Sequence, residues 1–524
     1  MSFSVHSETA STASEDVSLP RGWAWITVGD TGDYINGYAF KPAHREDTGR
    51  PIIRIQNLTD PTKPLNRTTL TVPSAYGIAT GEMLVSWSAT VDVFVWNREP
   101  ALVNQHIFRV VPNEGLVDKT FLFHWLKVAI DQLLISEHLH GSTMRHINRG
   151  PFMAHRIPLP PRREQDRIAQ TLEELLSDLD AGVAGLKAAQ RKLAQYRQSL
   201  LKAAVEGALT ADWRAARARS GEHQETGADL LQRILIERRA RWETRQLSKF
   251  AEQGKAAPKG WQAKYPEPVA PNTEGLPRLP TGWTWASVEQ IASDDPYSLA
   301  IGPFGSNLVV SDYRNSGVPL IFVRNIRSKV FEDTKYVTNE KAAELRAHRV
   351  DSGDVLVTKM GEPPGDAAVY PAGRPAAIIT ADCIKIRPQL DWIAAEYLCA
   401  AINSPIGVHQ IKPMTQGVAQ KKVSLGRFST FAVPLPSIEE QSHIVASLDL
   451  ALASVEQQER AIHHGIALAD AQRKNILKAA FAGQLVPQDP NDEPASTLLE
   501  RICAERTNQT GRPKLRGRKP RTTV

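Results

Sequence analysis

Two apolar stretches of the sequence carry side chains that could form paired hydrogen bonds. The stretches are IIRIQNL (52–58) and LIFVRNI (320–326). The polar residues in or beside them are Arg54, Gln56 and Asn57 in the first and Arg324, Asn325 and Arg327 in the second. Guanidinium and carboxamide groups can each bond two atoms of a guanine or adenine edge, so these residues are candidates for contact with nucleic acid bases. Asn57 and Asn325 occupy matching places and could equally be turn residues of a shared framework.

Further polar and basic residues lie in loops of the same two parts of the chain. Two groups precede the segments IPLP (157–160) and VPLP (433–436), and four residues lie elsewhere. These candidates are Arg145, His146, Asn148 and Arg149; Gln416, Gln420, Lys421 and Lys422; and Tyr38, Lys41, Ser306 and Lys359. Such side chains could reach phosphates or bases, although solvated loops have the same composition. The rings of Tyr38, Phe40 and Phe304 could stack on bases, but we expect them in the domain cores.

The sequence contains no recognisable catalytic or metal-binding motif. It has no G-x-x-x-x-G-K-[ST] phosphate loop, no G-x-S-x-G turn and no H-E-x-x-H pair. The three cysteines form no C-x-x-C pair, and Cys383 and Cys399 are expected to be core residues. His138, His140 and His146 have no counterparts later in the chain, which favours solvent or phosphate contact over metal binding. We therefore expect no catalytic residue and no metal site.

Composition indicates a globular chain with several domains. Of its 524 residues, 42% are hydrophobic, and the formal net charge is +6. The segment 512–521 alone carries six Lys or Arg residues and no acid, so the rest is nearly neutral and overall charge is weak evidence for a nucleic acid partner. No apolar stretch is long enough to span a membrane. Residues 1–18 do not resemble a signal peptide, and the low cysteine content is typical of the cytosol.

The chain repeats one plan in the same order. The matching segments are LPRGWAW (19–25) and LPTGWTW (279–285), PLPPRREQ (158–165) and PLPSIEEQ (434–441), SLLKAAVEGAL (199–209) and NILKAAFAGQL (475–485), and ADLLQRI (228–234) and STLLERI (496–502). The offsets change only by loop-sized steps, which indicates a tandem duplication. We interpret Trp23, Trp25, Trp283 and Trp285 as framework residues that recur because the whole unit recurs.

Within each copy, the pattern of apolar residues changes once. Residues 19–160 and 279–436 contain short apolar runs bounded by turn residues, which predict strands and loops. Within them, 120–131 and 396–403 have the pattern of short helices. From 162 to 206 and from 438 to 482 there is no proline, and apolar residues recur at helical spacing. Two long helices follow from this pattern.

Each long helix carries an apolar seam that needs a partner. The seam residues are Ile168, Leu172, Leu179, Leu186 and Leu200 in the first helix and Ile444, Leu448, Val455, Ile462 and Ile476 in the second. We expect the two helices to pair in antiparallel fashion. The alternative is that each folds back on its own globular part. Ser437 and Glu440 predict a capping box at the start of the second helix, and Gly207 and Gly483 suit the C-terminal caps.

These patterns predict an α+β chain of two similar mixed α/β domains, separated by an antiparallel pair of long helices with pseudo-two-fold symmetry. The predicted boundaries are a polar N-terminus (1–18), a first globular domain (19–160), a first long helix (161–208), a basic helix with a proline-rich connector (209–278), a second globular domain (279–436), a second long helix (437–484), and a short helix with a basic tail (485–524).

The repeated motifs, taken together, resemble those of the specificity subunits of Type I restriction-modification systems. The resemblance covers about 19–210 and 279–505. It rests on the PLP segments and EQ pairs that head both helices, on SLLKAAVEGALT and NILKAAFAGQLVP, and on GYAF…GRPIIRIQNL and GPFGS…GVPLIFVRNI. GVAQKKVS (417–424) fits a further family pattern well, and GSTMRHIN (141–148) fits it loosely.

The resemblance implies a non-catalytic, DNA-binding subunit. Each globular domain would then be a target-recognition domain that reads one half of a split double-stranded DNA target. The helices would set the spacing and dock two modification subunits, which would use S-adenosylmethionine to methylate adenine. Restriction subunits with ATP and Mg²⁺ could join them, and no cofactor is expected on this chain.

Two other classes of protein remain to be weighed. A coiled-coil adaptor with two protein-binding heads would bind no DNA, and the nearly neutral body of the chain is compatible with it. A lone DNA methyltransferase or nuclease would need a cofactor loop or an acidic metal-binding cluster, and the sequence shows neither.

Overall fold

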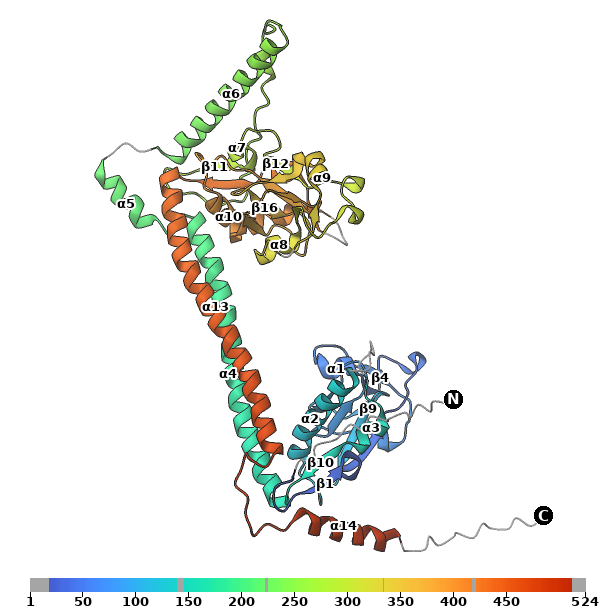
Figure 1. Cartoon of the computed structure of the whole chain (residues 1–524). Helices are drawn as coiled ribbons and strands as arrows, with labels where there is room; N and C mark the ends of the chain where they lie inside the picture. The colour runs from blue at the N-terminus through green and yellow to red at the C-terminus, as the bar shows by residue number, and fades with distance from the viewer. Residues whose placement is uncertain (1–17, 139–145, 222–224, 333, 417–420, 511–524) are drawn as a thin grey trace, which may run out of the picture. The chain divides into compact units, whose positions relative to one another are not determined.

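The computed structural model describes residues 18–138, 146–221, 225–332, 334–416 and 421–510. The chain, whose course Figure 1 shows, divides into two compact units. Unit 1 comprises Met1–Leu186 and His464–Val524, and unit 2 comprises Lys187–His463. Each unit therefore includes one part of each long helix. In the part of the chain that the structure describes, no helix has both the length and the apolarity needed to cross a membrane.

The described residues of unit 1 form three β-sheets. A two-stranded sheet pairs β1 (Ala24–Thr27) with β10 (Arg156–Leu159). One four-stranded antiparallel sheet has the order β2 (Gly32–Asn36), β9 (Ile107–Pro112), β6 (Met83–Ser86), β7 (Asp92–Val95). The other has the order β4 (Asn66–Thr68), β3 (Arg50–Ile53), β8 (Ala101–Val103), β5 (Gly77–Ile78), and its β3 and β8 are parallel.

Unit 2 repeats this arrangement strand for strand. β11 (Thr284–Ser287) pairs with β22 (Ala432–Leu435). The four-stranded sheets have the orders β12 (Leu299–Ile301), β19 (Cys383–Ile386), β16 (Val355–Thr358), β17 (Ala367–Val369) and β14 (Tyr336–Val337), β13 (Val318–Ile321), β18 (Ala377–Ile379), β15 (Arg349–Val350). β13 and β18 are again parallel. A small hairpin, β20 (Thr415–Gln416) with β21 (Lys422–Val423), is added. The shared strand order confirms the duplication and the mixed α/β class.

The helices follow the predicted pattern. Unit 1 holds α1 (Ile55–Thr59), α2 (Lys119–His138), α3 (Arg149–Ala154) and α14 (Ala495–Thr510). Unit 2 holds α5 (Ala211–Ser220), α6 (Gly227–Glu252), α7 (Val288–Ile291), α8 (Val323–Ser328), α9 (Asn339–Glu344), α10 (Ala395–Asn403), α11 (Pro405–Met414) and α12 (Leu425–Phe428). The long helices are α4 (Arg162–Val205) and α13 (Ile438–Phe481). The short helices expected at 120–131 and 396–403 are therefore confirmed as α2 and α10.

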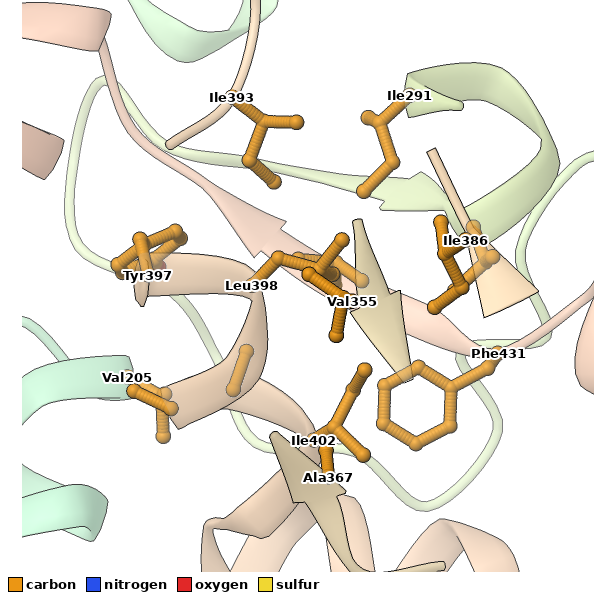
Figure 2. Close-up of a cluster of buried hydrophobic side chains, with 14 of the residues drawn as sticks. Val205, Ile291, Val355, Ala367, Ile386, Ile393, Tyr397, Leu398, Ile402 and Phe431 are labelled. Carbon is orange, nitrogen blue, oxygen red and sulfur yellow. The ribbon is translucent and has the colours of Figure 1, made fainter. Parts of the chain in front are cut away.

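Each globular domain is built around its central strands, and a long helix contributes to its core. In unit 2, β16 is buried along its whole length and α10 packs against it. Figure 2 shows Leu398 of α10 and Val355 of β16 in this cluster, together with Val205 from the end of α4. In unit 1, Ile168 and Leu172 of α4 join the corresponding core, as does Ile476 of α13.

The two long helices pair in antiparallel fashion, as predicted. In unit 1, Arg473 of α13 forms an ion pair with Asp180 of α4. In unit 2, Arg197 of α4 donates to Glu459 of α13 at 3.3 Å. Early residues of one helix thus contact late residues of the other within each unit. The alternative, in which each helix packs against a globular domain, is also partly correct. Within each unit, the ends of the helices belong to the core of the globular domain.

The predicted seam residues lie on the inner faces of the helices. Eight of them are buried, namely Ile168, Leu172, Leu200, Ile444, Leu448, Val455, Ile462 and Ile476. Leu179 and Leu186 are half-buried. Apolar residues outside the predicted seam, such as Leu450 (78% exposed) and Leu468 (61%), face outward. Periodicity therefore placed eight of the ten predicted seam residues at buried positions.

The start of each long helix is fixed by a tryptophan of the repeated phrase. The Trp23 indole donates to Glu164 Oε2 at 3.1 Å, and the Trp283 indole donates to Glu440 Oε2 at 2.8 Å. Of the two hydrogen bonds of the capping box predicted for Ser437 and Glu440, the structure shows one. The Ser437 hydroxyl accepts from the Glu440 amide at 3.3 Å, but the Glu440 carboxylate is used by Trp283 instead of returning to the helix start.

A glutamine beside each glutamate makes the same three hydrogen bonds in both units. Gln165 accepts from the Asp118 amide and donates to the carbonyls of Leu116 and Pro160. Gln441 accepts from the Ala394 amide and donates to the carbonyls of Trp392 and Pro436. The EQ pair therefore joins each helix to the globular domain that precedes it.

The end of each long helix packs against the other copy's tryptophan phrase. Gly207 (φ +74°) and Gly483 (φ +68°) adopt the left-handed conformation expected of C-terminal caps. A Cβ on Gly207 would lie 2.7 Å from Pro280 Cγ, and one on Gly483 would lie 2.5 Å from Pro20 Cγ. In each LP-x-GW segment, the tryptophan therefore bonds the start of one long helix and the proline contacts the end of the other. Both copies need these two contacts, which explains why the segment recurs.

The helices that follow these caps also occupy equivalent places. The Gly227 amide at the start of α6 donates to the Gly282 carbonyl at 2.6 Å, and the Ala495 amide at the start of α14 donates to the Gly22 carbonyl at 2.8 Å. Leu230 and Leu498, at matching positions in the two helices, are both buried. Unit 1 is therefore completed by the C-terminal part of the chain, and unit 2 by the segment between the copies.

Candidate nucleic-acid interface

The two asparagines of the apolar stretches are part of the framework. Asn57 is 3% exposed; its side chain accepts from the Arg54 amide at 3.1 Å and donates to the Pro64 carbonyl at 3.1 Å. Asn325 is 2% exposed; it accepts from the Phe322 amide and donates to the Val330 carbonyl. Of the two roles considered for these residues, the structure supports the turn-forming one, because their amide groups are buried and already bonded.

The residues beside the asparagines are more accessible. Gln56 and Arg324 are exposed, and Arg54 is half-buried. The Arg324 guanidinium lies 5.0 Å from the centre of the Phe322 ring. Arg327 is exposed but donates to Asp366 Oδ2 at 2.7 Å and to the Pro363 carbonyl at 2.6 Å, so it braces a neighbouring loop.

Most of the loop candidates lie at the surface. His146, Asn148 and Arg149 are exposed in unit 1. Asn148 precedes the first residue of α3, and the Arg149 guanidinium lies 5.6 Å from the centre of the Phe108 ring. Arg145 lies outside the described residues.

In unit 2, Gln416, Lys421 and Lys422 are exposed. Lys421 pairs with Glu362 at 2.7 Å. With its amide oriented to satisfy both groups, Gln416 accepts from the Arg427 guanidinium. Gln420 lies outside the described residues.

The remaining candidates differ in exposure. Lys41 and Ser306 are exposed, and Tyr38 is half-buried. Lys359 is only 7% exposed; it donates to the Ala381 carbonyl at 3.2 Å, and burial lowers its pKa.

Of the aromatic residues expected in the cores, Phe40 is buried and confirms the prediction. Phe304 is 58% exposed, so that prediction is wrong for it. Its ring instead lies 4.4 Å from the ammonium of Lys359. The Phe304 ring therefore covers a buried charge and presents its other side to the surface.

Backbone hydrogen bonds bring separate segments together at one edge of the first domain. The Trp87 amide donates to the His106 carbonyl at 3.1 Å, and the Ile147 amide donates to the Trp87 carbonyl at 2.9 Å. The Trp87 indole donates to Asn36 Oδ1 at 3.1 Å. We call this edge loop cluster 1; it consists of residues 36–41, 87–90, 104–106 and 146–149.

The same bonds form loop cluster 2 in the second domain, which consists of residues 302–307, 359–362, 380–382 and 421–423. The Lys359 amide donates to the Asp382 carbonyl at 2.7 Å, and the Val423 amide donates to the Lys359 carbonyl at 3.0 Å. The Gly302 amide donates to the Cys383 carbonyl at 3.1 Å. Candidates that are far apart in sequence thus share one edge in each domain.

Sequence reasoning did not single out Trp87, Asn104 and His106, which lie in loop cluster 1. The duplication itself carried the signal. Trp87 stands opposite Lys359 and His106 opposite Asp382 when the copies are aligned. Positions that keep the same backbone bonds but change side-chain chemistry are those expected of two domains with different ligands.

Burial raises the pKa of Cys383 to about 12 and that of Cys399 to about 11, so neither thiol is suited to act as a nucleophile. Among the described residues, no three His, Cys, Asp or Glu side chains gather in a way that could hold a metal ion.

Comparison with known proteins identifies the family. The sequence model described as "Type I restriction modification DNA specificity domain" matches residues 20–184 and 326–462, which is more than half of the chain. The chain belongs to this family. The first match includes all of loop cluster 1, and the second includes all of loop cluster 2 except residues 302–307.

Full-length relatives of this specificity-domain chain support the assignment. It is 26% identical over 515 residues to the Type I restriction enzyme EcoBI specificity subunit of Escherichia coli, with 95% of each chain covered. It is 22% identical over 526 residues to the EcoKI specificity subunit of Escherichia coli (strain K12), with 94% of this chain and 97% of the relative covered.

A solved structure shows the same fold. It is described as "Structural basis underlying complex assembly and conformational transition of the type I R-M system", and the similarity covers 89% of this chain and 100% of that chain. The TM-score is 0.59 at 18% identity, so this similarity concerns the fold of the specificity-domain chain alone.

Proposed function

We propose that the chain is the DNA-reading subunit of a Type I restriction-modification complex. Each globular domain binds one half of a split double-stranded DNA target through its loop cluster. The chain supplies recognition and performs no catalytic step itself.

The observation that carries this proposal is the contrast between the two loop clusters. The backbone hydrogen bonds of Trp87, Asn104 and Ile147 recur at Lys359, Thr380 and Val423, whereas the side chains of the two clusters differ at most positions. A pair of domains that reads two different half-sites needs a common scaffold with different contacts at the base edges. The alternative, a coiled-coil adaptor with two protein-binding heads, would bind no DNA.

We assign the long helices the role of fixing the distance between the half-sites. Each has 44 residues, or about 66 Å at about 1.5 Å per residue. Half-sites must keep a fixed spacing along the DNA helix, which a stiff helix pair can impose. The outward-facing Leu450 and Leu468 suit the docking of other subunits on the same helices.

The partners in this proposal are double-stranded DNA, two modification subunits and, in a complete system, restriction subunits. S-adenosylmethionine would bind to the modification subunits, and ATP with Mg²⁺ to the restriction subunits. The whole assembly would work on DNA in the cytosol.

The proposal is tested by expressing the chain with a modification subunit and mapping methylated adenines by single-molecule sequencing. We expect one split motif, and we expect the exchange of residues 19–160 for those of a relative to change one half of it only. A stable complex that methylates no motif, or a change in both halves, contradicts the proposal. A chain that binds neither a modification subunit nor DNA would favour the adaptor.

A further inference from the structure

The turn between β8 and β9 is formed by three polar residues, Asn104, Gln105 and His106. It joins the two four-stranded sheets of unit 1. Its backbone is firmly held, because the Asn104 amide donates to the Ile53 carbonyl at 3.2 Å and the Gln105 amide donates to the Tyr38 carbonyl at 2.9 Å. The side chains of this turn therefore have fixed starting points within loop cluster 1.

The backbone of this loop cluster is strained at two places. His106 has φ +73° and Ala89 has φ +60°. Among the described residues, four that are not glycine have positive φ, and two of the four lie here. Side chains disfavour this conformation, and such strain gathers at functional sites. A glycine at position 106 would adopt this backbone conformation without strain.

Two polar atoms of the turn have no hydrogen-bond partner among the residues that the structure describes. They are Asn104 Oδ1 and His106 Nδ1, and both are shielded from solvent. The Trp87 ring lies 4.6 Å from the imidazole of His106, with its own indole nitrogen bound to Asn36. Buried polar atoms are nearly always paired in folded proteins, so this pair of unsatisfied atoms suits a ligand that supplies their partners.

The equivalent turn of unit 2 keeps the backbone and changes the chemistry. The Thr380 amide donates to the Ile321 carbonyl at 3.0 Å, as Asn104 does to Ile53. The Thr380 hydroxyl also donates to that carbonyl at 2.8 Å and so has its partner within the domain. Asp382 replaces His106, and Lys359 replaces Trp87. The unsatisfied pair is therefore a property of the first domain and not of the shared framework.

We propose that Asn104 and His106 determine specificity in the first domain, by forming hydrogen bonds with base edges of one half-site after a small rotation of their side chains. Trp87 positions the imidazole. This inference rests on the proposed function and names residues for it. A carboxamide is suited to the adenine edge, where it can bond two atoms at once.

The test uses the full chain with its modification subunit and compares methylated motifs. The variants are Asn104→Ala and His106→Gly; the second loses the imidazole but accepts φ +73° without strain. Tyr297→Gly is the control, because it relieves the same kind of strain (φ +64°) at an exposed residue outside both loop clusters. Thermal unfolding checks that all three fold.

In both test variants we expect the base preference to relax at one or two positions of a single half-site, or methylation of the original motif to fall about tenfold or more, as a lost base contact predicts. Tyr297→Gly keeps the original motif. The inference is overturned if Asn104→Ala and His106→Gly keep the original motif and rate, or if both halves relax together. A wild-type chain that specifies no split motif would instead overturn the proposed function.

Discussion

A buried hydrogen bond from Trp283 helps to tie the second long helix to its globular domain. Trp283→Phe keeps most of the ring and removes the donor to Glu440, which is 4% exposed. We expect a loss of about 1–3 kcal/mol in the free energy of unfolding, because a buried carboxylate loses a partner. Urea denaturation followed by circular dichroism measures it. Trp285→Phe is the control, since that ring is only half-buried and faces Pro434 across the sheet; equal losses in both variants would contradict the assignment.

A buried lysine makes the stability of unit 2 depend on pH. Lys385 of β19 is 2% exposed and donates to the Arg349 carbonyl at 2.6 Å, and burial lowers its pKa to about 8 from the ordinary 10.5. The folded chain therefore disfavours the ammonium form. The resulting penalty is fully present below pH 8 and is relieved as the pH rises from about 8 toward 10.5.

The variant Lys385→Met removes this titration. Between pH 8 and pH 10.5 we expect the free energy of unfolding of the wild type to rise relative to that of the variant. The rise is at most about 3–4 kcal/mol, since one pKa unit corresponds to about 1.4 kcal/mol. Urea denaturation of both proteins at several pH values measures the difference. A difference that stays constant with pH, or that shrinks as the pH rises, is incompatible with the lowered pKa.

Residue types alone indicated part of the candidate site. Arg54, Gln56 and Arg324 were found because their side chains are those that pair with base edges, and the structure leaves them accessible or half-buried. Asn57 shows the limit of that reasoning. In the sequence, an asparagine that stabilises a turn cannot be distinguished from one that contacts a base. His106 could not be found this way. Its positive φ and its unpaired Nδ1 are properties of the turn that joins the two sheets, and they are visible only in the folded domain.

At the scale of the element, glycines in and after α4 have opposite roles. Gly182 lies within the helix, and an added Cβ would meet nothing within 4 Å. Gly182→Ala should therefore stabilise the chain by about 0.5–1 kcal/mol. Gly207→Ala should destabilise it by about 1–2 kcal/mol or more, because of its positive φ and the contact with Pro280. Thermal unfolding distinguishes the two signs, and a stabilising Gly207→Ala would refute the described cap.

The seam of the helix pair can be tested on one helix. Ile462 of α13 is 8% exposed, whereas Leu450 of the same helix is 78% exposed. Ile462→Ala should cost about 2–4 kcal/mol, the usual range for a buried isoleucine, and Leu450→Ala should change stability by less than about 0.5 kcal/mol. Circular dichroism during urea denaturation compares them. Similar losses would show that the seam lies elsewhere.

Helical periodicity predicted these elements well, because a long apolar stripe has few alternatives. The limits of α4 and α13 differ from the predicted boundaries by one residue at the start and three at the end. The capping box at Ser437 was only half correct, because Glu440 finds a better partner in an indole that lies 157 residues earlier in the chain. A local sequence pattern cannot predict a hydrogen-bond donor that comes from a distant part of the chain.

At the scale of the whole molecule, the duplication was the most informative feature of the sequence. It predicted two domains with one strand order, and the sheets of both units follow it. It did not reveal that each tryptophan phrase receives the end of the other copy's helix, since Gly207 with Pro280 and Gly483 with Pro20 are contacts between copies. Sequence comparison aligns equivalent residues, but it does not say which copy supplies the neighbour.

The central claim is that two domains on one scaffold read two different halves of a DNA target. The most direct measurement is the adenine methylation pattern that the chain confers on a modification subunit, before and after residues 19–160 are exchanged for those of a relative. The account predicts a split motif in which one half changes and the other half and the spacing stay the same. An unsplit motif, or an exchange that alters both halves, would contradict it.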